Sequence, residues 1–218
     1  MIVAVTMRML AHTTYVELRD AISHDWTRKL EGLGVTPVFV PNVLRDPVDY
    51  VRRIGAAGII LTGGESFSCG AAGMPMGTAR DRSEALLVGY ARRERVPLFG
   101  VCRGLQLINV LSGGTVSDDL AKGASHVNVM HPVRIVDAPT NGRGAVADIE
   151  TNSFHERAVF LRDLAPDLKP FALAAGDVVE GLYHADLPVI AVQWHPERHN
   201  PAADFDDRLL QGWLAQCE

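Results

Sequence analysis

Short apolar runs alternate with stretches of helical periodicity along the first half of the chain. Runs rich in β-branched residues predict strands, and apolar residues repeated every three or four positions predict helices. The alternation predicts strands at residues 2–5, 36–40, 58–61 and 97–101, and helices at residues 18–30, 47–54 and 82–95. The runs GIILTGG and PLFGVC are apolar at consecutive positions, which is typical of parallel strands covered by helices on both faces. This pattern predicts a doubly wound α/β domain with a mostly parallel central sheet flanked by helices.

The first of these helices is expected from Leu18, Ile22, Trp26 and Leu30, which are spaced four residues apart. From about residue 115 the pattern changes to shorter alternating runs, VNVMHPVRIV, KPFALA and VVEGLYH, separated by Gly, Asn and Pro. These runs indicate extra antiparallel strands at the edge of the sheet in the second half of the chain. An amphipathic helix is expected at residues 202–216.

Length and composition indicate a single domain over residues 1–218, because a chain of this size buries one sizeable core but hardly two. The net charge is −5 and the basic residues are scattered, so no nucleic-acid partner is expected. No apolar stretch approaches the roughly 20 residues that cross a bilayer, so no membrane partner is expected either. The three cysteines have unrelated spacings, which argues against a disulfide framework and against a zinc site. Together with an N-terminus unlike a signal peptide, these features favour a cytoplasmic location.

Cys102 stands at the junction where an apolar strand stops and a helix begins, with Gly100 and Gly104 on either side. A nucleophile on such a turn has a strained backbone, and small neighbours let the chain turn without steric clashes. The N-terminal end of the following helix favours a thiolate and binds a developing oxyanion. The alternative is that Cys102 is a small core residue, which is the usual fate of a free cysteine.

A second polar motif follows another apolar strand, where VIAVQW ends in His195, Pro196 and Glu197. Proline stops the strand, so the histidine and the glutamate are expected on an irregular loop at the strand end. A cysteine nucleophile needs an imidazole base and a carboxylate that orients it, and His195 and Glu197 supply both. His126 and His131, in SHVNVMHPV, are expected to have structural roles.

The order of the motifs GVCRGLQ, LSGGT, NSFH, EG and AVQWHPE resembles the class I glutamine amidotransferase-like superfamily, which has a flavodoxin-like fold. The resemblance runs from LTGG at residues 61–64 to WHPE at residues 194–197. It implies a Cys102, His195 and Glu197 triad and an oxyanion hole from the backbone N–H groups of Gly64 and Arg103. It also implies glutamyl-binding residues, which are Gln106, Asn152, Ser153, Phe154 and His155.

Arg103 and the Arg80-Asp81 pair with Glu84 look like the γ-glutamyl hydrolase (peptidase C26) family, which includes the γ-glutamyl-γ-aminobutyrate hydrolases. The N-terminal segment, including Thr6-Met-Arg8 and Trp26, looks like the γ-glutamyl-CDP-amidate hydrolases of capsular phosphoramidate synthesis. Arg8 would then face the phosphoryl part of the leaving group, since arginine binds phosphate through two parallel hydrogen bonds. The alternative is an arginine that is solvated or paired with Glu17 or Asp20.

The resemblance implies hydrolysis of a γ-glutamyl amide through a Cys102 thioester, with release of glutamate. The favoured substrate is a γ-glutamyl nucleotide phosphoramidate or a γ-glutamyl small amine. The alternatives are a glutaminase subunit that donates ammonia to a synthase, and a non-catalytic binding protein on the same scaffold. No cofactor and no metal are expected, and a homodimer is compatible with the sequence. Gly63–Gly77 is expected to form a surface loop beside the site.

Overall fold

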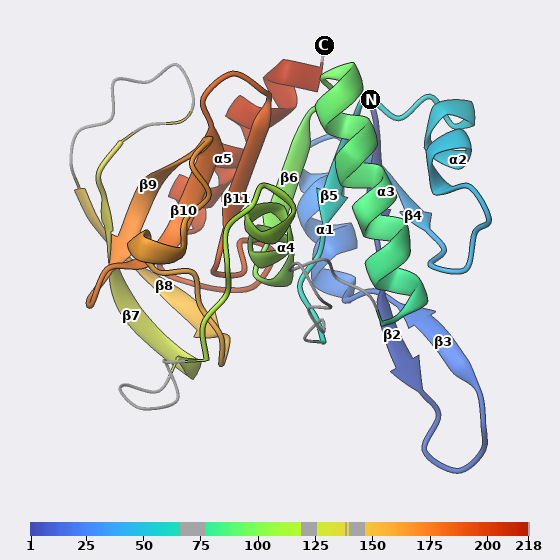
Figure 1. Ribbon diagram of the computed structural model, residues 1–218, viewed down its shortest axis with the longest axis horizontal. Helices are drawn as coiled ribbons and strands as arrows, with labels where there is room; N and C mark the ends of the chain where they lie inside the picture. Colours follow the sequence, from blue (N-terminus) through green and yellow to red (C-terminus); the bar gives the residue numbers. More distant parts are fainter. Residues whose placement is uncertain (66–76, 119–125, 138, 140–146, 218) are drawn as a thin grey trace.

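The computed structural model describes residues 1–65, 77–118, 126–137, 139 and 147–217. Its central feature is a nine-stranded sheet with the strand order β4-β1-β5-β6-β11-β10-β9-β7-β8 (Figure 1). The parallel half contains β4 (Thr36–Val40), β1 (Ile2–Thr6), β5 (Gly58–Leu61), β6 (Leu98–Val101) and β11 (Val189–Val192). The antiparallel half contains β10 (Val178–His184), β9 (Leu168–Ala174), β7 (Val127–Ile135) and β8 (Ala147–Phe154). The predicted α/β fold is confirmed, including the antiparallel strands that the second half adds at one edge.

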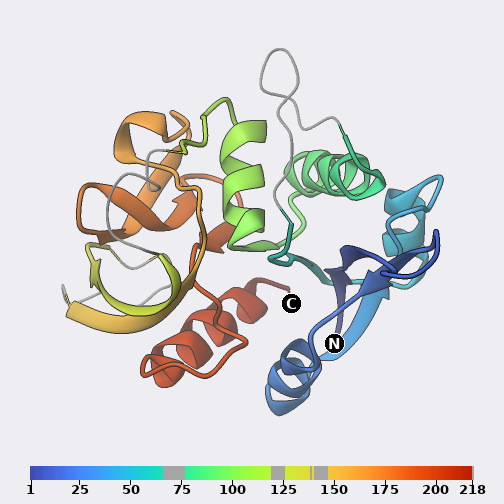
Figure 2. The same ribbon diagram turned by 90° about the horizontal axis from the view of Figure 1, so that it is seen from below.

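Helices cover both faces of the parallel half, as Figure 2 shows. One face carries α2 (Pro47–Arg53), α3 (Ala79–Glu94) and α4 (Arg103–Leu111), whose apolar residues share one core with β5 and β6. The other face carries α1 (His24–Gly32) and α5 (Ala203–Leu214), whose residues Trp26, Leu30 and Trp213 share a second core. Parallel strands buried on both faces need no polar alternation, which explains the continuous apolar runs. Among the described residues, no helix is long and apolar enough to cross a membrane.

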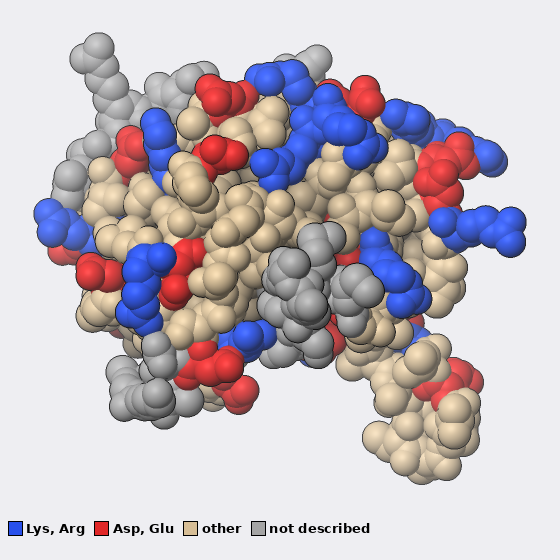
Figure 3. Space-filling model, viewed as in Figure 1, with Lys and Arg blue, Asp and Glu red and all other residues tan. Residues whose placement is uncertain are grey.

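The helix predicted over residues 18–30 is wrong in its first six residues, 18–23. Residues 8–21 form a hairpin of β2 (Arg8–Ala11) and β3 (Leu18–Ala21), which projects from the body of the molecule (Figures 1 and 3). The helix begins only at His24, where the Ser23 hydroxyl accepts a hydrogen bond from the backbone N–H of Asp25. Spacings of four residues are multiples of the strand period of two, so this spacing alone does not separate the two structures.

The carboxyl ends of β1, β5, β6 and β11 meet at one edge of the sheet, because these neighbouring strands are parallel. The segments that follow β5, β6 and β11 carry Gly64, Cys102 and His195 respectively. Ligands bind at this edge in open α/β sheets. The topology therefore collects the predicted site from segments that lie far apart in the sequence.

Leu30 and Leu18 provide a matched test of where the first helix begins. Leu30 is fully buried, whereas Leu18 on β3 is 67% exposed. Leu30→Ala should lower the free energy of unfolding by about 2–5 kcal/mol, the range for truncating a buried leucine. Leu18→Ala should change it by less than about 0.5 kcal/mol, as is usual for an exposed position. Urea unfolding of both variants measures the difference, and equal costs would contradict the hairpin.

Candidate active site

Cys102 lies between β6 and α4 on a turn with an unusual backbone conformation. Its φ of 53° and ψ of −101° lie outside the regions that L-residues ordinarily adopt. Its backbone N–H donates to the carbonyl of Val192 at 2.8 Å, which fixes the turn to the end of β11. A non-glycine residue in such a conformation costs roughly 1–3 kcal/mol and persists only where the surroundings enforce it.

The two flanking glycines allow this turn because there is no space for side chains beside it. A Cβ at Gly104 would lie 2.5 Å from the carbonyl oxygen of Leu61, and one at Gly100 would lie 2.7 Å from Cδ1 of Ile108. Both distances are shorter than real Cβ contacts. The glycines at minus two and plus two are therefore required by the packing of β5, β6 and α4 against one another.

His195 is held on three sides. Its Nδ1–H donates to Oε1 of Glu197 at 2.7 Å, and its ring is almost fully buried. Asn152 binds its backbone twice, donating from Nδ2 to the His195 carbonyl and accepting from the His195 N–H, each at 2.9 Å. Gly63 lies against the ring, where a Cβ would come within 2.6 Å of Cε1 of His195 and 3.4 Å of Cβ of Cys102.

His195 and the Cys102 thiol interact electrostatically, and the charges of both groups follow from this pairing. Burial by itself would lower the pKa of His195, but Glu197 and the Cys102 thiolate raise it to about 9. Burial likewise favours a neutral thiol, but His195, with a further contribution from His155, lowers the pKa of Cys102 below its ordinary value. The arrangement favours a thiolate–imidazolium pair near neutral pH.

Gly64 lies at the meeting point of two pockets. The larger, of about 610 Å³ including its open mouth, is lined by Cys102, Gln106, Phe154 and His155 among others. The smaller, of about 300 Å³ on the same measure, has a wall formed by Arg8, Ile22, Trp26, Thr62, Gly63, His195, Glu197 and Arg198. Cys102 thus lines one pocket and His195 lines the other, and Gly64 borders both pockets.

Gly64 and Arg103 are the residues predicted to form the oxyanion hole. Gly64 has a φ of +145°, which L side chains rarely adopt, and a Cβ there would lie 2.5 Å from Nη1 of Arg80. Arg103 is the first residue of α4, and the first-turn N–H groups of a helix point out of its N-terminal end. Both residues line the pocket that contains Cys102, and their role in binding an oxyanion stays a prediction.

A buried group of charged side chains supports this backbone. Glu84 accepts from Nε of Arg80 at 2.9 Å and from the Thr6 hydroxyl at 2.7 Å, and it also pairs with Arg103. Arg80 donates to the Thr62 and Gly63 carbonyls at 2.7 and 3.1 Å. Burial opposes ionisation of Glu84, but the two arginines outweigh it and lower its pKa. Resemblance alone singled out Arg80, Glu84 and Arg103, and their contacts give them a physical role.

The predicted glutamyl-binding residues divide into two groups. Gln106, Phe154 and His155 line the larger pocket. Asn152 and Ser153 are buried behind it, where Asn152 holds the His195 backbone and Ser153 donates to the carbonyl of His126 at 2.7 Å. Glutamyl contact by these two residues stays a prediction, and their observed contacts are with the protein. Most of the predicted Gly63–Gly77 loop, residues 66–76, lies outside the described residues.

Arg198 is a pocket residue that the sequence motifs did not predict. It lies directly after the WHPE motif and lines the smaller pocket together with Arg8. Its guanidinium stacks on the Phe154 ring, with 4.3 Å from Cζ to the ring centroid. The only signal for it in the sequence is its position next to Glu197.

Comparison with known proteins agrees with the class that this fold and site indicate. The structure resembles that of a glutamine amidotransferase from Thermotoga maritima, with a TM-score of 0.69 over 100% of this chain and 98% of that chain. Sequence identity to that protein is 12%, so the likeness concerns the fold alone. The fold is that of the class I glutamine amidotransferases.

The family follows from the sequence match. The Peptidase C26 family matches residues 1–197, and the chain belongs to this family. It is 25% identical to the γ-glutamyl-CDP-amidate hydrolase of Campylobacter jejuni over 99% of this chain and 98% of that protein. It is also 29% identical to a glutamine-hydrolysing GMP synthase subunit from Pyrococcus furiosus, over 80% of this chain and 82% of that protein. The family and these relatives support a hydrolase acting on C–N bonds.

The pairing of Cys102 with His195 predicts a reactive thiol at neutral pH. At pH 7 iodoacetamide should alkylate Cys102 faster than it alkylates an ordinary thiol with a pKa of about 8.5, which is only a few per cent ionised there. His195→Gln should lower this rate at least about tenfold, because it removes the main charge that lowers the pKa of Cys102. Peptide-resolved mass spectrometry over a pH series measures the rate.

Two controls accompany this measurement. Cys217, whose pKa burial raises to about 12, should stay slow in the same samples. His24→Gln, a change at an exposed histidine, should leave the alkylation of Cys102 unchanged. Equal alkylation rates in the wild type and in His195→Gln would refute the ion pair.

Proposed function

We propose that the protein hydrolyses a γ-glutamyl amide through a thioester on Cys102. The observation that carries the proposal is the arrangement of His195, whose Nδ1–H donates to Glu197 and whose pKa is raised by both Glu197 and the neighbouring Cys102. A nucleophile, a base and a group that orients the base are the components of covalent acyl transfer. Their position at the C-terminal edge of the sheet, beside a pocket, supports a catalytic role.

The reaction follows from the protonation states of the pair. The Cys102 thiolate attacks the γ-carbonyl carbon, forming the C–S bond, and the oxyanion is bound by the N–H groups of Gly64 and Arg103. The C–N bond then breaks while the His195 imidazolium gives its proton to the departing nitrogen. In the second step water attacks the thioester, His195 takes the proton, and glutamate and the thiolate are released. A pKa of about 9 keeps His195 protonated for the first step at neutral pH.

The two pockets suggest how the substrate divides. The larger pocket, which contains Cys102 and Gln106, would take the glutamyl half. The smaller pocket would take the leaving group, because it adjoins His195, the proton donor to the departing nitrogen. This division assigns Gly64 to the position of the scissile bond.

Two arginines in the smaller pocket favour an anionic leaving group, such as a nucleotide phosphoramidate. Arg8 and Arg198 both line it, and planar guanidinium groups suit phosphoryl oxygens. Among the described residues Arg8 has no ion-pair partner, since Glu17 pairs with Arg19 and Asp20 accepts from Asn42. The Nε of Arg8 is buried without a hydrogen-bond partner in the part of the chain that the structure describes. The relative from Campylobacter jejuni, named for a γ-glutamyl-CDP-amidate, supports the same substrate class.

A glutaminase subunit that donates ammonia to a synthase is the second candidate. The similarity to the GMP synthase subunit from Pyrococcus furiosus favours it. This candidate predicts weak glutamine hydrolysis by the chain alone and strong activation by a synthase. Rapid hydrolysis of an extended γ-glutamyl amide without any partner supports the hydrolase instead.

The first test concerns the nucleophile. The purified chain should release glutamate from a panel of γ-glutamyl amides, and Cys102→Ala should abolish turnover while keeping the far-ultraviolet circular dichroism spectrum. Loss of the nucleophile removes the covalent route altogether. Cys217→Ala, a change at the partly buried cysteine near the C-terminus, should retain full activity. Substantial turnover by Cys102→Ala would refute the thioester.

The second test concerns the leaving group. Arg8→Ala should lower kcat/KM for a γ-glutamyl nucleotide phosphoramidate by about tenfold or more, since hydrogen bonds to charged groups contribute roughly 1.5–3 kcal/mol. It should leave kcat/KM for a γ-glutamyl small amine unchanged within about twofold, because alanine keeps the Cβ that packs beside Gly64. Arg19→Ala, on the projecting hairpin, is the matched control. Equal decreases in kcat/KM for both substrates would contradict a role of Arg8 in recognising the leaving group.

A further inference from the structure

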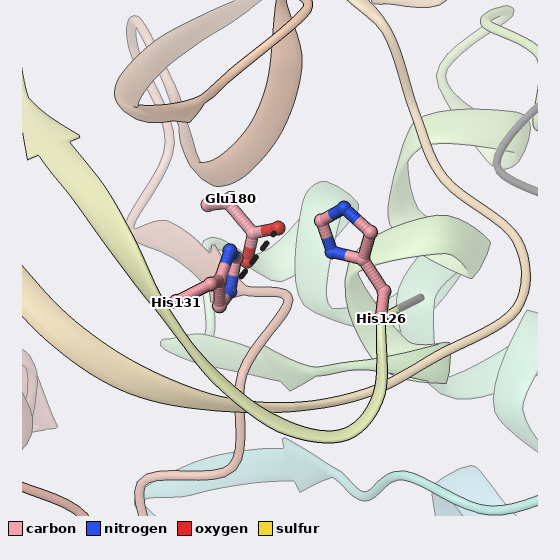
Figure 4. Close-up of side chains that lie close together, drawn as sticks. All are labelled: His126, His131 and Glu180. Carbon is pink, nitrogen blue, oxygen red and sulfur yellow. Dashed lines mark ion pairs between the residues drawn. The ribbon is translucent and has the colours of Figure 1, made fainter. Parts of the chain in front are cut away.

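A second group of titratable side chains lies beside the site, and three of its four members, His126, His131 and Glu180, have no part in the proposed reaction. His126 precedes β7, His131 lies on β7, Glu180 lies on β10 and His155 follows β8. The ring centroid of His126 lies 5.0 Å from that of His131 and 4.9 Å from that of His155. Figure 4 shows the imidazoles of His126 and His131 directed toward the Glu180 carboxylate.

The Glu180 carboxylate has unsatisfied hydrogen-bonding capacity. It is fully buried, and among the described residues neither of its oxygens has a hydrogen-bond partner. The nearest cationic candidates are Nε2 of His155 and Nε2 of His131, at 3.4 and 3.8 Å from Oε1. Both nitrogens also lack hydrogen-bond partners within the described part of the chain. Buried polar atoms are nearly always paired, so the Glu180 carboxylate and the two imidazoles are expected to bind an additional partner.

Three of these side chains suit a metal ion. One ligand atom each from His126, His131 and Glu180 lie within 4.8 Å of one another. Ligand atoms that each lie about 2.0–2.2 Å from one ion lie within roughly 4 Å of one another. Small side-chain rotations would therefore bring these three ligand atoms to bonding distance of one ion. Imidazole nitrogen with a carboxylate oxygen is a donor set for divalent transition metals such as Zn²⁺, and it leaves further positions for water.

A backbone irregularity brings the two histidines together. Residues five apart on a regular strand point to opposite faces, because the side-chain period is two. Between Val127 and Val129 the register with β8 shifts, and Asn128 has a φ of 57°. Such a bulge adds one residue and redirects the side chains that precede it. His126 therefore lies next to His131.

Neighbouring polar groups contact the imidazole rings of His155 and His126. Nδ1–H of His155 donates to the carbonyl of Arg157 at 2.9 Å, which directs its Nε2 toward Glu180. The Ser153 hydroxyl donates to the His126 carbonyl and lies 3.3 Å from its Nδ1. Metal-binding histidines commonly have such contacts to carbonyls and polar side chains behind the ligands.

We propose that His126, His131 and Glu180 form a binding site for one divalent transition metal ion, with His155 beside the carboxylate. The site joins the start of β7 to β10 and borders the larger pocket through His155. It is separate from the Cys102 pair. The alternative is a buried His155–Glu180 ion pair that binds no metal, which the experiment distinguishes.

The test uses the full-length chain carrying Cys102→Ser and no polyhistidine tag, so that the catalytic thiolate cannot bind metal. After treatment with a chelator, titration calorimetry with Zn²⁺ should show one ion bound per chain. Glu180→Gln and His131→Ala should each weaken binding at least about tenfold, within the range for lost metal-site groups. Co²⁺ absorption should show nitrogen and oxygen ligands without a thiolate band.

Two variants keep the test decisive. His126→Ala changes a partly exposed residue and should keep the fold by circular dichroism while losing the ion, even if Glu180→Gln fails to fold. His24→Ala, at a histidine outside the cluster, should bind as the parent does. Absence of stoichiometric binding, or equal affinity in the cluster variants and the parent, would overturn the proposal. The readout is binding by a chain without the nucleophile, so it does not depend on the proposed hydrolysis.

Discussion

The buried ion pairs of Glu84 with Arg80 and Arg103 are the constraint on which the geometry of the candidate site depends. They connect α3 to the first residue of α4, and the Thr6 hydroxyl adds the end of β1. Arg80 extends the connection to the Thr62 carbonyl after β5. A buried charge without its partner costs several kcal/mol, so these groups stabilise one arrangement of the strand ends. The turn at Cys102 and the backbone at Gly64 both lie within this arrangement.

The other half of the site is held by a different set of contacts. Asn152, on the antiparallel side of the sheet, fixes the backbone of His195 through two hydrogen bonds. Glu197 fixes the orientation of its ring. The antiparallel extension therefore contributes to the candidate site by holding His195, while the ion pairs around Glu84 hold the turn at Cys102. Rigid support of this kind is what a strained backbone at Cys102 needs in order to persist.

The charge of the whole chain is a poor guide to the charge of its site. The net charge of −5 disfavours an anionic substrate in general. The smaller pocket nevertheless has Arg8 and Arg198 in its wall. Salt screens exposed charges beyond about 10 Å, so groups in the wall of a pocket dominate the field that a ligand there experiences.

The local pattern of residues was sufficient to predict the fold class and the strand ends at which Cys102 and His195 lie. Continuous apolar runs indicate burial on both faces of the sheet, and the glycines around Cys102 indicate a tight turn. Solvation decides the first pattern and steric exclusion the second, and each acts locally along the chain. The hairpin at residues 8–21 was beyond this reasoning, since a spacing of four fits a strand as well as a helix.

Only the tertiary structure shows how these segments contact one another. The fold placed Asn152 behind His195, turned Arg103 toward Glu84, and brought Arg198 into the pocket of Arg8. It also brought His126 and His131 close to Glu180 of β10 through a bulge in β7, which the sequence periodicity does not predict. Such contacts depend on packing between distant segments, and distances across a fold are not encoded in the local pattern of residues.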